Sequence, residues 1–186
     1  TEIRKKADIP IFAQHIDPVE KPGAYTGHVI AENLKDLGIS GTLINHSERR
    51  LEKNQIKECI RIAKGLGIVS VCCADTSKNA GELAGLGPDF IAIEPPELIG
   101  TGVSVSAARP EAVTQSVKEV MDANPKVRVL CGAGITSGDD VRRALKLGAS
   151  GVLVASGVVK SPEPEKVLAD FAAAISSSLI YSEANK

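Results

Sequence analysis

Short apolar runs and longer amphipathic stretches alternate along the whole chain. The apolar runs are rich in Val, Ile and Leu and lie near 9–14, 42–44, 69–71, 90–93, 127–130 and 152–154. The stretches between them carry apolar residues at helical spacing, near 29–37, 52–66, 78–86, 110–123, 138–147 and 164–178. Strands that are apolar throughout are typical of parallel sheets, whose two faces are both buried. The alternation therefore predicts an α/β protein with right-handed crossovers between its strands.

The dipeptide Leu-Gly marks the expected ends of several helices. It occurs at 37–38, 66–67, 86–87 and 147–148, each time shortly before an apolar run. Glycine suits this position because it adopts the left-handed conformation that closes a helix at little cost. At the other ends, the expected N-caps are Ser77, Ser137 and Ser161, and the prolines that fit a first helical turn are Pro110 and Pro162.

The spacing of the strands indicates the fold. Each strand with its helix takes roughly 20 to 40 residues, the size of a βα unit. An eight-unit barrel needs about 250 residues, whereas this chain has 186 and begins with Thr1. We therefore expect a single domain over 1–186, a TIM (β/α)8-type barrel that here supplies about six βα units and lacks its first two strands. An open doubly wound sheet is the alternative.

The charge balance and the cysteines narrow the class of function. Lys and Arg sum to 22 and Asp and Glu to 23, so the net charge is −1. This balance offers no positive surface to a nucleic acid or an anionic membrane, and no run approaches the ~20 apolar residues of a membrane span. The four cysteines lack metal-ligand spacing and are interpreted as small core residues, which favours a reducing, cytoplasmic compartment. Cys72 and Cys73 should point to opposite faces of one strand.

Two candidate catalytic side chains follow the ends of expected strands. His46 comes after the strand at 42–44, and Glu94 after the strand at 90–93. The C-terminal strand ends form the active site of such a barrel, so both should face the same opening. There a carboxylate can remove a proton while an imidazole polarises the neighbouring oxygen. Each residue alone could be a cap or a surface group, but the pairing favours catalysis. Structural, ion-pair or interface roles are expected for His15, His28, Arg49 and Arg50.

The segment after Glu94 has the composition of a lid. Pro95 and Pro96 stiffen its beginning, and Gly100 and Gly102 free its end. A stiff tip between such hinges can close over a site and exclude water from a reactive intermediate. A rigid connector without motion is the alternative.

Small residues that suit a phosphate follow the last two strands. Residues 131–138 read Cys-Gly-Ala-Gly-Ile-Thr-Ser-Gly, and residues 155–157 read Ala-Ser-Gly. Small side chains let backbone N–H groups approach an anion without help from a lysine. Many phosphate-binding barrels share this pattern, so it predicts a phosphate and not a particular reaction.

Three motifs together resemble the triosephosphate isomerase family in its archaeal form. Residues 46–50, His-Ser-Glu-Arg-Arg, are similar to the family's electrophile motif. Residues 94–102, Glu-Pro-Pro-Glu-Leu-Ile-Gly-Thr-Gly, are similar to its catalytic base and lid, and residues 24–28 to its protruding interface loop. The resemblance extends over nearly the whole chain.

The resemblance implies an isomerase of glycolysis and gluconeogenesis that interconverts dihydroxyacetone phosphate and D-glyceraldehyde 3-phosphate. It makes Glu94 the base and His46, held neutral, the electrophile. This family is itself a standard example of active-site pKa values that are adjusted by their surroundings. It places Glu48 near the mouth of the site. The phosphate would be held by backbone at Ile99, Gly100, Gly134, Ala155 and Ser156. No metal or organic cofactor is implied, and the assembly would be a homo-oligomer, either a tetramer or a dimer.

The family also places an Asn and a catalytic Lys at the end of its first strand. Residues 4–6, Arg-Lys-Lys, belong instead to a charged, helix-like stretch ahead of Ile9. We therefore expect about fifty residues, with two strands and that lysine, to be absent. The strands at 9–14 and 152–155 would then be unpaired edges, so the chain alone should aggregate or close the gap through a neighbour. Two alternatives stay open: a phosphate-binding barrel lyase or synthase, and an impaired fragment that binds phosphate or a partner subunit.

Overall fold

The computed structural model describes residues 2, 6, 8–95 and 104–184 of the chain. Six parallel strands form one curled sheet, in the same order along the sheet as along the chain. Their bounds are β1 Phe12–Ala13, β2 Gly41–Ile44, β3 Val69–Ala74, β4 Phe90–Ile93, β5 Arg128–Cys131 and β6 Gly151–Val152. Because every neighbouring pair is parallel, the C-terminal ends of the strands lie along one rim of the sheet.

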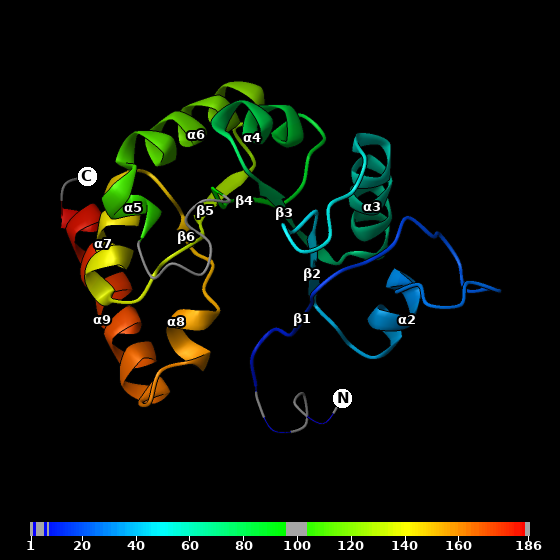
Figure 1. Cartoon of the computed structure of the whole chain (residues 1–186), viewed down its shortest axis with the longest axis horizontal. Coiled ribbons are helices and arrows are strands. Elements are labelled where there is room, and N and C mark those ends of the chain that lie inside the picture. Colours follow the sequence, from blue (N-terminus) through cyan, green and yellow to red (C-terminus); the bar gives the residue numbers. More distant parts are fainter. Residues whose placement is uncertain (1, 3–5, 7, 96–103, 185–186) are drawn as a thin grey trace.

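Helices connect the strands and surround the curled sheet from outside (Figure 1). They are α2 Ala31–Asp36, α3 Lys53–Leu66, α4 Ser77–Ala84, α5 Val105–Ala108, α6 Pro110–Ala123, α7 Gly138–Lys146, α8 Ser156–Val159 and α9 Pro164–Ala184. The result is part of a (β/α) barrel, which confirms the predicted fold class. The doubly wound alternative was wrong, because its strand order reverses at a switch point, whereas here the order is sequential.

The predicted elements are present, with differences at their ends. Strand β1 covers two residues rather than 9–14, since Pro10 has no N–H to donate to a ladder. Helix α4 is capped by Thr76, whose hydroxyl accepts from the Asn79 N–H, and not by Ser77. Helix α9 begins at Pro164, as the expected range 164–178 predicted, so Pro162 precedes the helix and is not in its first turn. Helices α5 and α8 were not predicted, because four residues are too few to show a helical period.

Buried side chains lie on both faces of the sheet. Cys72 belongs to the larger core between the sheet and the helices, whereas Cys73 joins Val71 and Ala92 in a smaller cluster on the other face. The two cysteines thus point to opposite faces, as predicted. All four cysteines are buried and unpaired, and burial raises the pKa of each thiol above its ordinary value. They are therefore uncharged side chains at neutral pH.

The sheet is open between its first and last strands. In the described part of the chain, β1 and β6 each pair on one side only, so the expected gap is present. Large apolar side chains are exposed near both edges. They include Ile9 and Phe12, before and within β1, and Val159 at the end of α8, the helix that follows β6.

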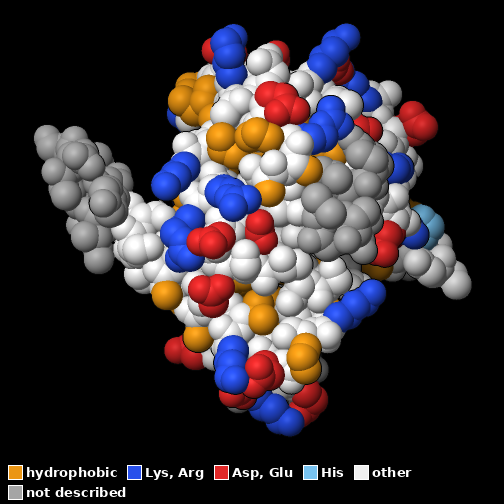
Figure 2. Space-filling view, turned by 60° about the vertical axis from the view of Figure 1, so that its left-hand side comes forward, with side chains coloured by type: hydrophobic (Ala, Val, Ile, Leu, Met, Phe, Trp, Pro, Cys, Tyr) orange, Lys and Arg blue, Asp and Glu red, His pale blue; other side chains and the backbone are white. Residues whose placement is uncertain are grey.

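Positive and negative side chains are interspersed on the face that carries α7 and α9 (Figure 2). This mixture agrees with the net charge of −1. None of the helices within the described ranges is long and apolar enough to cross a membrane. Over the same ranges, His, Cys, Asp and Glu side chains form no group of three that could hold a metal ion.

Candidate active site

His46 and Glu94 lie side by side at the C-terminal rim of the sheet. His46 follows β2 and Glu94 follows β4, and β3 runs between these two strands. The Nε2 atom of His46 is 3.5 Å from Oε2 of Glu94. The side chains are 24% and 10% exposed, respectively, so the pair is shielded from bulk water yet open to a small ligand. The structure thus brings together the two residues that the sequence singled out.

The turn after β2 holds the backbone that carries His46. Asn45 has a left-handed conformation, with φ of 63°. Its buried side chain donates to the Cys73 carbonyl at 3.0 Å and accepts from the Leu51 N–H at 3.0 Å. These two bonds tie the turn to β3 on one side and to the segment before α3 on the other.

A backbone hydrogen bond assigns the tautomer of His46. The Glu48 N–H donates to Nδ1 at 3.3 Å, so Nδ1 is the acceptor in this contact. In a neutral imidazole the proton is then on Nε2, the nitrogen that faces Glu94. His46 can therefore offer an N–H to an oxygen atom placed near Glu94. The Glu48 carboxylate is 89% exposed, with Oε2 3.7 Å from Nδ1.

The Glu94 carboxylate packs against a glycine and a cysteine. Its Oε2 is buried and accepts no hydrogen bond from the described residues. Gly132, after β5, leaves room for it, because a Cβ there would lie 2.6 Å from Cγ of Glu94. Burial raises the pKa of the Cys73 thiol, and the nearby Glu94 carboxylate raises it further. A shielded carboxylate oxygen without a bound donor is available to accept a proton.

The loop after β5 has a constrained backbone. Ala133 and Gly134 both have positive φ, 68° and 70°, and a non-glycine residue in this region is uncommon and often marks a functional site. Asp140 braces the loop, because its Oδ2 accepts from the backbone N–H and the hydroxyl of both Thr136 and Ser137, at 3.0 to 3.2 Å. Ser137 caps α7, as predicted: its hydroxyl oxygen accepts from the Asp140 N–H at 3.3 Å, and the Asp140 carboxylate accepts in return from the Ser137 N–H.

The segment after β6 packs directly on that loop. A Cβ on Gly157 would clash with the carbonyl oxygen of Ile135, so the close approach of the two backbones requires glycine. Ala155 and Ser156 immediately precede Gly157 and therefore lie near the loop that carries Gly134. Two further predicted phosphate residues, Ile99 and Gly100, lie outside the described residues.

The remaining histidines and the two arginines form other contacts. Arg49 is 2.9 Å from Asp17 and Arg50 is 3.9 Å from Asp75, which confirms the expected ion pairs. His15 contacts Asp17 at 3.1 Å. His28 packs edge-on against Tyr25, with ring centroids 5.8 Å apart. Neither of these histidines joins the pair formed by His46 and Glu94.

Sequence reasoning missed three side chains that support the site. Asp140 follows Ser137 at the spacing of a capping box, a signal that was visible in the sequence. Asn45 ends an apolar run, where a residue that tolerates the left-handed conformation marks a sharp turn. Asp17 gave no such signal, because its partner Arg49 is 32 positions away.

Comparison with known proteins places the chain among isomerases. The family model for triosephosphate isomerase matches residues 1–175. The chain is 50% identical over 166 residues to the triosephosphate isomerase of Methanocaldococcus jannaschii, a match that covers 89% of this chain and 75% of that protein. It is 51% identical over 167 residues to the triosephosphate isomerase of Saccharolobus solfataricus, covering 90% of this chain and 73% of that protein.

Solved structures share the fold at much lower identity. Thiamine phosphate pyrophosphorylase from Pyrococcus furiosus superposes with a TM-score of 0.64 at 17% identity. The match covers 96% of this chain and 73% of that one. Identity this low shows a common barrel architecture and nothing of the reaction, because one fold supports many chemistries.

Proposed function

The chain belongs to the triosephosphate isomerase family, and from this premise we propose that it interconverts dihydroxyacetone phosphate and D-glyceraldehyde 3-phosphate. One observation carries the proposal. A buried carboxylate oxygen of Glu94 without a donor lies 3.5 Å from the imidazole nitrogen of His46. A base and a hydrogen-bond donor at this separation can act on adjacent atoms of one small substrate.

Glu94 acts as the base in the proposed reaction. Its carboxylate takes a proton from the hydroxymethyl carbon beside the substrate carbonyl, and the electron pair of that C–H bond forms the double bond of an enediolate. Glu94, whose acquired proton exchanges with solvent, then delivers a proton to the former carbonyl carbon. Through His46, the hydroxyl proton on the oxygen of the first carbon passes to the former carbonyl oxygen, so the ketone becomes the aldehyde. The buried Oε2 supports this role, because it accepts no hydrogen bond from the described residues, and the His46 nitrogen 3.5 Å away is the group proposed to donate to the substrate.

His46 stabilises the oxygens of the intermediate. The N–H on Nε2 donates to the oxygen that gains charge as the C–H bond breaks, and a donor placed in advance lowers the free energy of that state. The bond from the Glu48 N–H to Nδ1 supports the role, since it keeps the donor proton on the nitrogen that faces Glu94. The Glu48 carboxylate lies near the mouth of the site.

The substrate phosphate binds, in this proposal, at the corner between the loops after β5 and β6. The close packing of Gly157 on Ile135 supports this placement, because it sets two stretches of small residues side by side. Backbone N–H groups in such stretches can approach an anion closely. The residues proposed to hold the phosphate are Gly134, Ala155 and Ser156, together with Ile99 and Gly100.

Family membership also supports wider properties that we propose for the chain. It acts in glycolysis and gluconeogenesis, in the cytoplasm, as one domain within a homo-oligomer, either a tetramer or a dimer. The reaction needs no metal or organic cofactor, because moving a proton between adjacent carbons requires only a base and a hydrogen-bond donor.

The test is a coupled assay of triose phosphate interconversion with the purified chain and two variants. Glu94→Gln keeps the shape of the side chain but cannot take a proton, so the rate should fall roughly 1000-fold. His46→Gln should lower the rate about 100-fold. In deuterated water the product should gain deuterium at the carbon that receives the proton.

Glu163→Gln is the matched control, because the Glu163 side chain is 58% exposed and pairs with Lys166 on the surface. Its rate should equal that of the unmodified chain. A chain without isomerase activity, or a Glu94→Gln variant as active as the control, would overturn the proposal.

A further inference from the structure

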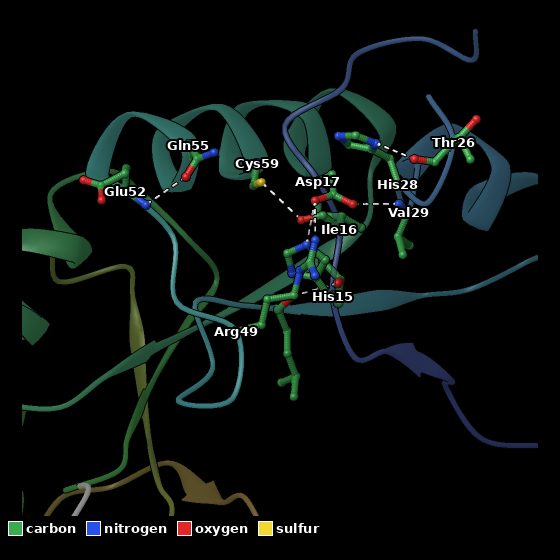
Figure 3. A network of polar contacts seen from close by, with 12 residues as sticks. His15, Ile16, Asp17, Thr26, His28, Val29, Arg49, Glu52, Gln55 and Cys59 are labelled. Carbon is green, nitrogen blue, oxygen red and sulfur yellow. Dashed lines mark hydrogen bonds and ion pairs between the residues drawn. The ribbon is translucent and has the colours of Figure 1, made fainter. Parts of the chain in front are cut away.

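A second buried carboxylate lies near the site, outside the pair formed by His46 and Glu94. Asp17 follows β1 and is 5% exposed. Its Oδ1 accepts from the Arg49 guanidinium at 2.9 Å and lies 3.1 Å from Nε2 of His15, while its Oδ2 accepts from the Val29 N–H at 2.7 Å. Figure 3 shows these side chains converging on Asp17.

These contacts keep Asp17 charged. Burial alone would raise its pKa, but the hydrogen bonds from the Val29 backbone, His15 and Arg49 outweigh burial and lower the pKa to about 2. A carboxylate that is buried and charged needs its donors, because an unpaired one would be costly. Asp17 is therefore a negatively charged side chain in a fixed position, in the segment that follows β1.

Arg49 connects Asp17 to the turn that carries His46. The Arg49 N–H donates to the His46 carbonyl at 2.9 Å and closes the turn of residues 46–49. Within the same turn, the Glu48 N–H donates to Nδ1 of His46 at 3.3 Å. Arg49 is thus bound to His46 through its backbone and to Asp17 through its side chain.

We propose that Asp17 is a positioning residue for His46, acting through Arg49. The ion pair holds one end of the turn against the segment that follows β1, while Asn45 holds the other end against β3. Between these two attachments, the turn keeps the Glu48 N–H on Nδ1 and keeps Nε2 directed at Glu94. The inference rests on the proposed role of His46 in the isomerase reaction.

A purely structural role for Asp17 makes a different prediction. The Val29 bond and the backbone bond from the Asp17 N–H to the Val29 carbonyl, at 2.9 Å, close the base of the loop between these residues. If Asp17 served only this loop, removing Arg49 would not change turnover. The Arg49 side chain is 56% exposed, and an ion pair with an exposed partner adds little to stability.

The test is a double-mutant cycle with Arg49→Gln, Asp17→Asn and the double variant. We expect Arg49→Gln to lower kcat about tenfold with KM within twofold. This is less than the roughly 100-fold cost of misplacing a catalytic group by about 1 Å, because Asn45 still holds the other end of the turn. The double variant should lose no more than the worse single variant, because both changes break one contact. Arg49→Lys should recover part of the lost turnover, since it restores a positive donor.

The control is Asp122→Asn, which removes the acid of another 2.9 Å ion pair, with Lys118 on the outer helix α6. It should leave kcat and KM unchanged. A second readout does not depend on turnover: the imidazole ¹⁵N shifts of His46 should change in Arg49→Gln and stay as they are in the control. Unchanged kcat and unchanged shifts in Arg49→Gln would overturn the inference.

The outcomes separate this inference from the proposed function. If His46→Gln and Glu94→Gln keep full activity, the proposed function fails. If both lose activity while Arg49→Gln behaves like Asp122→Asn, the proposed function stands and Asp17 is a structural residue only.

Discussion

His46 and Glu94 meet across an intervening strand, with Nε2 of the imidazole 3.5 Å from Oε2 of the carboxylate. Neighbouring strands are about 4.8 Å apart, so the ends of β2 and β4 on either side of β3 are roughly twice that distance from each other. The two side chains therefore lean toward one another over the end of β3. Cys73 of β3 is small enough to lie beside the Glu94 carboxylate without blocking the contact.

Shortening the base should separate catalysis from binding. We expect Glu94→Asp to lower kcat about 100-fold, because the loss of one methylene withdraws the carboxylate by about 1 Å from the substrate carbon. KM should change far less, since the loops proposed to bind the phosphate are untouched. Steady-state kinetics measure both quantities, and wild-type turnover in the variant would show that Glu94 is not the base.

A substitution at Gly132, the glycine after β5, should act on Glu94, whose atoms are the nearest to an added Cβ. In Gly132→Ala the new Cβ would lie 2.6 Å from Cγ of Glu94, so the carboxylate must move, and we expect kcat to fall at least tenfold. Gly65→Ala is the control, because a Cβ at Gly65 in α3 meets nothing within 4 Å and alanine favours the helix. Equal kcat in the two variants would contradict the packing described for Glu94.

The positions of His46 and Glu94 could be predicted because they follow from topology. In a parallel sheet all strands end at the same rim, so a His and a Glu that each follow an apolar run had to lie on one side. Pairing of β2 with β3 and of β3 with β4 then brought them within contact distance. The local sequence, together with the rule that parallel strands end at one rim, was therefore sufficient to predict that the two side chains lie close together.

The contact between Asp17 and Arg49, which supports the turn that carries His46, could not be predicted in the same way. Asp17 and Arg49 are 32 positions apart, and their contact depends on the path of two irregular segments. The length of β1 likewise depends on Pro10 and on pairing at a sheet edge, where apolar periodicity carries little information. Short helices such as α5 and α8 escape detection because a single turn has no period.

The left-handed turn at Asn45 should tolerate glycine better than alanine. Both variants lose the bonds to Cys73 and Leu51, but only Ala is strained at a φ of 63°, at a cost of about 1 kcal/mol or more. We therefore expect Asn45→Ala to have the lower free energy of unfolding, by about 1 kcal/mol. Urea denaturation measures this difference, and equal stabilities would show that the turn relaxes.

The proposed phosphate corner should bind inorganic phosphate through backbone N–H groups. A crystal soaked in phosphate should show the anion at Gly134 and Ser156, and calorimetry should give weaker binding for Gly157→Ala, whose Cβ would clash with the Ile135 carbonyl. Gly65→Ala should bind as the unmodified chain does. An anion bound elsewhere, with this corner empty, would contradict the assignment.

Asp17 should make the protein sensitive to acid. Its carboxyl has a pKa of about 2 in the folded protein against an ordinary value of 3.8, despite burial, because Val29, His15 and Arg49 donate to it. A lowered folded pKa means that the unfolded chain binds the proton first as the pH falls. The stabilisation is therefore complete above about pH 4 and disappears as the pH approaches 2.

Asp17→Asn should remove this pH dependence together with the charge. A shift of this size corresponds to about 2 kcal/mol of unfolding free energy, so the unmodified chain should lose about that much more stability than Asp17→Asn between pH 5 and pH 2. Asp139→Asn is the control: Asp139 also pairs with an arginine, Arg142, but its side chain is 70% exposed, so solvent screens the pair and the control should follow the unmodified chain closely. Urea denaturation across this pH range measures the three curves. Parallel curves for the unmodified chain and Asp17→Asn would mean that the pKa of Asp17 is the same in the folded and unfolded states. That result would contradict the stabilising contacts with Arg49 and Val29.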